Sequence, residues 1–375
     1  MSSRPLYALV TLIFPLTAFV IVWAIFCKGV PRDLPVAVND GDHSALSRQL
    51  IRMIDASSTI AVAYRVTDPE SGHRLIRKGK AYALIVLQND FEEHVLSGKA
   101  PAVINYYNNG FLLPGSLIAR DVRRAVGTLS AGLDQRFRQR RNHMTHVVSG
   151  AIEPIRVENH ELFNPYLNYT YFLVSTLLPN MLQIFVLVMT VYALGVELKD
   201  GTAKEWLACS GERTWKAILG KLAPYTLLFG IVGLFMNTFL FRYLGVPLRG
   251  SPGIIVVATF LMILAYQAVG LFLVSITANL RLALSFSAFY ASTAFAFVGV
   301  TFPTIGMPLA ARIWAGILPL YYFIRIFVDQ AMRGVPPDLD LSYLAVLLAF
   351  VLFVPVFPLF RMGQLMRDEK YWGRL

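Results

Sequence analysis

Residues 197–221 read Glu197-Leu-Lys-Asp-Gly-Thr-Ala-Lys-Glu-Trp-Leu-Ala-Cys-Ser-Gly-Glu-Arg-Thr-Trp-Lys-Ala-Ile-Leu-Gly-Lys221. This polar stretch lies between two stretches without a charged residue, 162–196 and 222–241. About 20 consecutive apolar residues are enough to cross a bilayer as a helix. The pattern therefore predicts two membrane spans joined by a short polar loop that contains an amphipathic helix of its own.

Uncharged stretches recur along the chain of 375 residues, which is 56% hydrophobic and only 15% charged. Soluble domains carry about 25% charged residues. The expected fold class is an α-helical polytopic membrane protein with six transmembrane helices. We place these spans at 6–27, 171–196, 220–241, 253–276, 283–301 and 341–360. The first, within 1–27, is interpreted as a retained N-terminal anchor because no small-residue cleavage site follows it.

The basic residues predict the orientation of the spans. Short cytoplasmic loops carry an excess of Lys and Arg. The 197–221 loop and the tail after the last span both do so, through Lys199, Lys204, Arg213, Lys216, Lys221, Arg361, Arg367, Lys370 and Arg374. We therefore expect a multi-pass protein of the bacterial inner membrane with both termini in the cytoplasm and with residues 28–165 outside.

Strand and helix patterns alternate in this outer segment. We predict strands at 34–38, 60–66, 81–87 and 102–107, and helices at 44–55, 70–78, 91–97 and 114–148. Such alternation indicates an α/β domain. The expected organisation is thus an extracytoplasmic α/β domain, 28–165, inserted between the first span and a five-helix transmembrane domain, 166–375.

The segment 302–330 leaves two interpretations open. Its stretch 313–328 is apolar apart from Arg325, but Pro319 interrupts it. We favour a re-entrant or interfacial pair of short helices on the outer side, and the alternative is a seventh span that would place the C-terminus outside. The candidate residues of this outer gate are Phe302, Pro303, Met307, Pro308, Pro319 and Tyr321.

Within the polar loop, Gly201 and Thr202 are expected to end one helix and to cap a second helix that begins at Ala203. Glu205, Trp206 and Leu207 would give this second helix an anionic start and an apolar face, and Gly211 would end it. The alternative interpretation is an ordinary interfacial helix anchored by Trp side chains.

A family resemblance distinguishes these two interpretations. The pattern Glu197-x-x-x-Gly201-Thr202-x-x-Glu205-x-Leu207, with Gly220-Lys221 at the start of the next span, resembles the coupling loop of ABC-2-type transporter permeases. Similar to that family are also Asn164-Pro165, the run from Phe302-Pro303 to Met307-Pro308, and Leu318-Pro319-Leu320-Tyr321-Tyr322-Phe323. Ala203-Lys204 and Cys209-Ser210 depart from its usual pattern.

The resemblance implies a permease subunit of an ATP-driven exporter. It implies a separate ABC ATPase chain that binds ATP and Mg, a second permease (identical or closely related), and membrane lipids as partners. The outer domain would either gate the exit or receive a periplasmic adaptor protein. The residues expected to couple the permease to the ATPase are Glu197, Gly201, Thr202, Glu205, Trp206, Leu207, Gly220 and Lys221.

No catalytic site is expected in this chain. Gly220-Lys221 is followed by Leu222, and Trp215 occupies the position of the first glycine of a phosphate-binding loop. His143 and His146 have a possible ligand spacing, but no cysteine or acid completes a metal set, so we expect no metal and no cofactor.

The net charge and the outer domain each suggest a further class of function. The net charge of +11 could indicate nucleic-acid binding, yet more than half of the 34 basic residues precede residue 157. The densest run, 136–141, is interpreted as a solvated helix face, with lipid headgroups or an adaptor as the alternative and no nucleic acid. A membrane receptor or scaffold that senses a ligand through the outer domain remains the alternative function.

Polar residues within the spans are few. They include Asn180, Gln183, Asn237, Tyr266 and Gln267, and we interpret them as hydrogen-bonding partners between helices. The sequence places no acidic residue in the middle of a span, whereas proton-coupled transporters usually need one. This pattern disfavours a secondary transporter.

Overall fold

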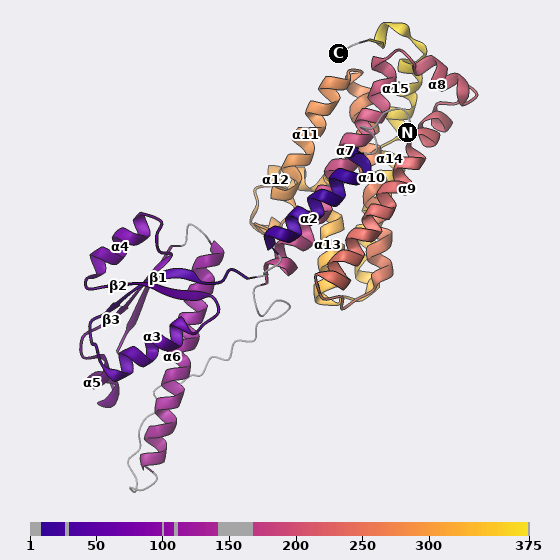
Figure 1. Ribbon diagram of the computed structural model, residues 1–375. Coiled ribbons are helices and arrows are strands. Elements are labelled where there is room, and N and C mark those ends of the chain that lie inside the picture. Colours follow the sequence, from indigo (N-terminus) through magenta and orange to yellow (C-terminus); the bar gives the residue numbers. More distant parts are fainter. Residues whose placement is uncertain (1–8, 27–29, 100, 109–111, 142–167, 374–375) are drawn as a thin grey trace. The chain divides into compact units, whose positions relative to one another are not determined.

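The chain consists of two compact units. The structure is a computed structural model that describes residues 9–26, 30–99, 101–108, 112–141 and 168–373 (Figure 1). The first unit combines Met1–Gly29 with Leu162–Leu375, and the second is Val30–Glu161.

Helices dominate the first unit, and six of those described are long and apolar enough to cross a membrane. This confirms the predicted class of polytopic helical membrane protein. The six spans comprise η1 (Leu9–Ile13) with α2 (Phe14–Phe26), η2 (Thr170–Val174) with α7 (Ser175–Lys199), α9 (Thr214–Thr238) with η3 (Phe239–Tyr243), α10 (Pro252–Thr277), α11 (Leu280–Phe297), and η6 (Pro337–Asp340) with α14 (Leu341–Phe353) and α15 (Val356–Arg367).

Small residues let the central helices of this unit approach closely. A β-carbon added at Gly270 of α10 would lie 2.8 Å from the Thr190 Cγ2 of α7, and one at Gly233 of α9 would lie 2.7 Å from the Thr259 Cγ2 of α10. Lipid tails are as apolar as leucine, so helices in a membrane associate largely through such close packing. The arrangement makes α7 and α10 the interior of the bundle.

Hydrogen bonds between polar side chains supplement this packing. Asn237 Nδ2 donates to Thr259 Oγ1 at 3.0 Å, and Thr226 Oγ1 donates to Gln267 Oε1 at 2.8 Å. Gln183 Nε2 donates to the carbonyl oxygen of Ala291 at 3.3 Å. The predicted helix–helix role of Gln183, Asn237 and Gln267 is therefore confirmed.

A four-stranded sheet forms the centre of the second unit. Its strands are β1 (Leu34–Asp40), β2 (Ile60–Val66), β3 (Ala83–Leu87) and β4 (Val103–Tyr107), in the order β2-β1-β3-β4. β1 runs parallel to β2 and β3, and β4 is antiparallel to β3. The helices are α3 (Ala45–Asp55), α4 (Pro69–Arg77), α5 (Phe91–Leu96) and α6 (Leu112–Arg141).

The helices cover both faces of the sheet (Figure 1). Val36, Val38 and Ile85 share a core with α3, α5 and α6, whereas Ala37 and Leu84 face α4. Parallel strands are connected in a right-handed sense, so a chain that passes from β1 out to β2 and back to β3 puts its two connecting helices on opposite faces. Each predicted strand and helix is present. For the last helix, residues 142–148 of the prediction lie outside the described part of the chain.

Candidate functional site

The polar loop 197–221 forms a hairpin in which the short helix α8 (Ala203–Cys209) lies between α7 and α9. Gly201 and Gly211 have φ values of +72° and +65°, in the left-handed region. After each of these glycines the chain closes a Schellman turn: Thr202 N donates to the Glu197 carbonyl at 3.0 Å, and Glu212 N to the Leu207 carbonyl at 3.2 Å. The predicted start of α8 at Ala203 and its end before Gly211 are confirmed.

The Thr202 side chain does not cap α8, contrary to the prediction. Its hydroxyl donates to the carboxylate of Glu197, and its backbone has φ −87° and ψ 3° rather than the extended conformation of a capping residue. A charged acceptor forms a stronger hydrogen bond than a neutral one, which accounts for this choice.

Glu197 also forms an ion pair with Lys221, which connects the end of α7 to α9 about two turns after its start at Thr214. The two side chains are 17% and 21% exposed. The Lys221 ammonium lies 5.4 Å from the centre of the Trp206 ring, and Trp206 Nε1 donates to the Ala217 carbonyl at 3.2 Å. Four predicted coupling residues thus form one contact network inside the hairpin: Glu197, Thr202, Trp206 and Lys221.

The two faces of α8 differ in burial. Ala203 and Leu207 are buried against the bundle, and Trp206 is half-buried. The exposed residues Lys204, Glu205, Ala208 and Cys209 follow the i, i+1, i+4, i+5 spacing of one helix face, and we call them the α8 outer face. The predicted apolar face of α8 therefore packs inward, and Glu205 is the predicted coupling residue on the outer face.

Gly220 lies apart from this network. It is exposed, and a β-carbon added there would meet no atom within 4 Å. Cys209, a free and exposed thiol, lies on the α8 outer face, whereas Cys27 is outside the described residues.

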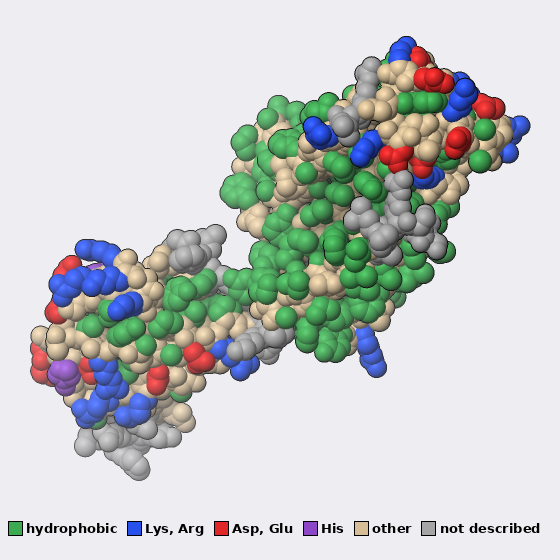
Figure 2. Space-filling model, turned by 45° about the horizontal axis from the view of Figure 1, so that its top comes forward, with side chains coloured by type: hydrophobic (Ala, Val, Ile, Leu, Met, Phe, Trp, Pro, Cys, Tyr) green, Lys and Arg blue, Asp and Glu red, His purple; other side chains and the backbone are tan. Residues whose placement is uncertain are grey.

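Residues near the C-terminus also contact the hairpin, which the sequence reasoning missed. Arg367 Nη2 donates to the Glu212 carbonyl at 3.2 Å, and Gly373 N donates to the Leu198 carbonyl at 3.1 Å. Figure 2 shows charged side chains gathered at this end of the unit, while its sides are largely hydrophobic. The sequence could have suggested these contacts, because the tail after the predicted last span is rich in aromatic and basic residues.

The segment 302–330 contains η4 (Thr304–Gly306), α12 (Leu309–Gly316) and α13 (Pro319–Val328), which continues as η5 (Asp329–Arg333). α12 and the α13–η5 helix are bent by 85° at the break between them. We call this break, at residues 316–320, the elbow. Three tyrosine hydroxyls form hydrogen bonds with its backbone: Tyr290 donates to the Ile317 carbonyl, Tyr322 donates to the Gly316 carbonyl, and Tyr266 accepts from Leu320 N. Unpaired backbone groups are costly in a membrane, so these bonds stabilise the break.

The α13–η5 arm leads from the elbow toward the end of the bundle at which α10 begins. Arg325 Nη2 of α13 donates to Thr304 Oγ1 at 2.8 Å, and Gly250 N, just before α10, donates to the Gln330 carbonyl at 2.8 Å. Tyr266 lies 14 residues after the start of α10, or about 21 Å along it. The elbow therefore lies about half-way along the bundle.

The predicted gate residues take different places in this segment. Phe302 is 54% exposed, Met307 is buried, and Pro303 and Pro308 directly precede η4 and α12. Pro319 is the first residue of α13, where its missing N–H is not needed. Tyr321 has the Arg325 guanidinium 5.2 Å from its ring centre.

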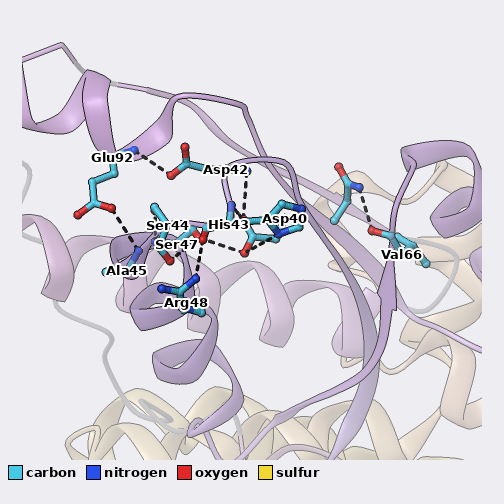
Figure 3. Close-up of polar contacts among 10 residues, drawn as sticks. Asp40, Asp42, His43, Ser44, Ala45, Ser47, Arg48, Val66 and Glu92 are labelled. Atoms are coloured by element: carbon cyan, nitrogen blue, oxygen red, sulfur yellow. Dashed lines mark hydrogen bonds and ion pairs between the residues drawn. The ribbon is translucent and has the colours of Figure 1, made fainter.

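Acidic side chains gather in the second unit at the end of β1 and in the segments that follow β1 and β3 (Figure 3). Asp40 accepts from His43 N and Ser47 Oγ, both at 3.0 Å. Asp42 accepts from Glu92 N at 3.0 Å, and Glu92 accepts from Ala45 N at 3.2 Å. Burial raises the pKa of Asp42, but hydrogen bonds from Ser44 and from the backbone of residues 90–92 outweigh this and hold the pKa below its usual value. These carboxylates connect loops, and no group of three potential metal ligands occurs among the residues described.

Six apolar helices, a bent pair and a polar hairpin define a multi-pass helical membrane protein. The profile of the ABC-2 family transporter proteins matches residues 7–357, nearly the whole chain, and the chain belongs to this family. It is a transporter permease, and the family implies an ATPase partner.

Two relatives from Escherichia coli are similar to most of the chain. Both carry the name "Probable multidrug ABC transporter permease YbhS", one from strain K12 and one from O157:H7. Each is 25% identical over 287 residues, which cover 74% of this chain and 72% of the relative. No solved structure gives a significant match.

Proposed function

We propose that this chain is the permease subunit of an ATP-driven exporter. Two permeases, identical or closely related, would form the translocation pathway between them, and a separate ATPase chain would bind ATP and Mg. The observation that carries the proposal is the hairpin, which is held rigidly from within while the α8 outer face stays exposed. Family membership supports it.

In this proposal the hairpin end of the bundle faces the cytoplasm, where ATP is available. The basic residues of the hairpin and of the tail agree with this orientation. The second unit is then extracytoplasmic, since the first span separates it from the N-terminus, and the 302–330 segment enters the membrane re-entrantly from the outer side. The host membrane would be a bacterial inner membrane with both termini in the cytoplasm.

In this proposal the exposed face of α8 binds the ATPase, and its buried side connects it to the membrane helices. The α8 outer face docks in a groove of the ATPase, and Glu205 presents its charge there. When ATP binding moves the groove, α8 moves as a rigid body, because the network of Glu197, Thr202, Trp206 and Lys221 ties it to α7 and α9. ATP shifts the membrane helices only to the extent that the complex binds it better in one conformation.

The composition of the spans supports a proposal for the substrate class. The described spans are rich in aromatic side chains, and the one fully buried acidic residue among those described in this unit, Asp340, lies directly before α14 and not in the middle of a span. Such surroundings suit an amphipathic or lipid-like molecule. The word "multidrug" in the name of the two relatives is compatible with this proposal.

Affinity purification from mild detergent tests the proposal. We expect an ATP-binding-cassette chain to co-purify with the native protein and to hydrolyse ATP faster when amphipathic substrates are present. Glu205→Lys should reduce the co-purified ATPase by about tenfold or more, since it reverses a charge at the interface. Glu93→Lys, the same exchange at an exposed residue of the second unit, is the matched control and should bind normally.

Two results would contradict the proposal. One is recovery of the chain alone under conditions in which the complex of a related permease stays intact. The other is a Glu205→Lys protein that binds and stimulates the ATPase as well as the native protein does. The first result would favour a receptor or scaffold and would direct attention to ligands of the second unit.

A further inference from the structure

We propose that residues 367–373, which we call the C-terminal brace, position the coupling hairpin, so that two distant parts of the chain form the ATPase-docking platform together. This inference rests on the proposed function of the hairpin. It goes beyond that function by assigning positioning roles to Arg367, Trp372 and Gly373, which lie outside the 197–221 loop.

Arg367 holds the turn that follows α8. Its guanidinium donates to the carbonyls of Gly363 and Glu212, both at 3.2 Å. Glu212 has a φ of +60°, which is an unfavourable conformation for a residue with a β-carbon. A charged donor on the carbonyl of this residue stabilises the turn in the conformation that sets the angle between α8 and α9.

Trp372 and Gly373 hold the turn that precedes α8. The Trp372 ring lies 4.0 Å from where a β-carbon of Gly201 would be, and its Nε1 donates to the Leu365 carbonyl at 3.0 Å. Gly373 N donates to the Leu198 carbonyl at 3.1 Å. That carbonyl is one of the last four of α7, which have no partner within the helix itself. The brace therefore contacts the turns on both sides of α8.

The helix that carries the brace is fixed to the same core as the hairpin. Met362, Leu365 and Met366 of α15 are fully buried in the cluster that contains Ala203 and Leu207 of α8. At Gly363 the helix approaches α9 so closely that an added β-carbon would lie 2.8 Å from Thr214 Oγ1. The brace thus starts from a rigid base.

The brace also extends the surface that a partner would meet. Glu369 lies 3.7 Å from Lys204 of the α8 outer face, with both side chains about 70% exposed. So exposed an ion pair contributes little to stability. The ion pair matters for the shape of the docking surface instead. It places a carboxylate of the brace beside the charges of the α8 outer face, where it would enter the same groove of the ATPase.

Hydrogen exchange on the detergent-solubilised full-length protein, combined with the ATPase co-purification, tests this inference. Trp372→Ala should raise the exchange rates of the hairpin amides, among them Trp206, Ser210 and Gly211, by about fivefold or more and should lower substrate-stimulated ATP hydrolysis severalfold. Trp372→Phe, which keeps the ring but not the indole N–H, should restore much of both. Phe360→Ala removes an exposed aromatic side chain of α15 that lies outside the hairpin and the brace, and it should leave the hairpin exchange rates unchanged.

A second variant covers the case in which Trp372→Ala fails to fold. Arg367→Gln changes an exposed side chain and removes its charged contact with the Glu212 carbonyl, so it should raise exchange at residues 209–213 without loss of folded protein. Unchanged hairpin exchange in both variants, or normal ATPase stimulation in both, would overturn the inference.

The Glu205→Lys variant separates this inference from the proposed function. If Glu205→Lys loses the ATPase while the brace variants behave as the native protein, the brace inference is wrong and the proposed function stands. If the ATPase never co-purifies with the native protein, the proposed function fails, and the positioning role fails with it.

Discussion

Glu197 and Lys221 form an ion pair at the boundary of two membrane spans, and we expect it to contribute to stability. Lys221→Met would leave the Glu197 carboxylate with the Thr202 hydroxyl in a mostly buried place. Removing one partner of such a pair costs about 2 kcal/mol or more. We expect a drop of several degrees in thermal unfolding in detergent, whereas Lys199→Met, at an exposed lysine near the same end, should have little effect.

The charge-reversed double variant, Glu197→Lys with Lys221→Glu, should recover part of the lost stability. A Lys221→Met protein that unfolds with the native protein would show that the pair contributes nothing.

Asp42 predicts an acid sensitivity of the second unit. Its folded pKa is lowered by hydrogen bonds, so it lies below the unfolded value of about 3.9. A group of this kind adds stability above the unfolded pKa, and this stability is lost as the pH falls through the folded pKa. We expect Asp42→Asn to speed hydrogen exchange at residues 90–92 at pH 7. The difference from the native protein should shrink below pH 4, after correction for intrinsic exchange rates.

Asp68→Asn provides a comparison within the same unit. The pKa of Asp68 is lowered by hydrogen bonds from the side chain and backbone of Ser71, at the start of α4. Its effect on exchange should be confined to α4. An Asp42→Asn difference that persists unchanged at pH 3 would contradict the assignment to the ionised carboxylate.

At the scale of elements, the crossing of α7 and α10 predicts a strict size limit. Gly270→Ala would place a methyl group 3.0 Å from the Thr190 Cβ, which is too close to the backbone of α7 to move aside. Overpacking of this kind costs about 1–3 kcal/mol. Gly253→Ala in the same helix, where the nearest atom would be 3.7 Å away, is the control. Thermal unfolding in detergent should separate the two variants, and equal stability would contradict the packing argument.

The backbone of the elbow between α12 and α13 should be sensitive to the loss of a single tyrosine hydroxyl. Tyr290→Phe keeps the ring but removes the hydroxyl that donates to the Ile317 carbonyl. A hydrogen bond between membrane helices contributes about 1 kcal/mol. Hydrogen exchange at residues 317–320 should increase severalfold, while Tyr243→Phe, at a ring that is 63% exposed, should leave it unchanged. No change in either variant would show that the elbow does not depend on its tyrosine.

Elements defined by local pattern were predictable from the sequence. The spans follow from uncharged stretches, and the start of α8 follows from Gly201, because few residues other than glycine readily adopt the left-handed conformation found there. The orientation of α8 was not predictable in the same way. Trp206 and Leu207 suggest an apolar surface for a partner, but the bundle provides the apolar surface against which they pack. The Thr202 hydroxyl has a charged acceptor in Glu197 that lies close to it only once α7 has ended in its turn.

At the scale of the whole molecule, the sequence predicts the elements of the second unit much better than it predicts the contacts of the C-terminal brace. The α/β pattern of the second unit is local and regular, so its strands and helices were identified from the sequence within a few residues. The contacts of the C-terminal brace are not local: Arg367 and the Glu212 carbonyl that it contacts are 155 residues apart. No periodicity within a single stretch could indicate such a contact, since it depends on how α15 packs against α9.

This separation has a consequence for biosynthesis. A ribosome adds about 5–20 residues per second, so the hairpin emerges roughly 7–30 s before the brace that holds it. During that interval α8 lacks the contacts of Trp372 and Gly373. An ATPase that requires a fixed hairpin would therefore bind incomplete chains only weakly. Nascent chains stalled before residue 367 should therefore cross-link to the ATPase through Cys209 less efficiently than chains released beyond residue 373. Equal cross-linking would show that subunit assembly begins during translation.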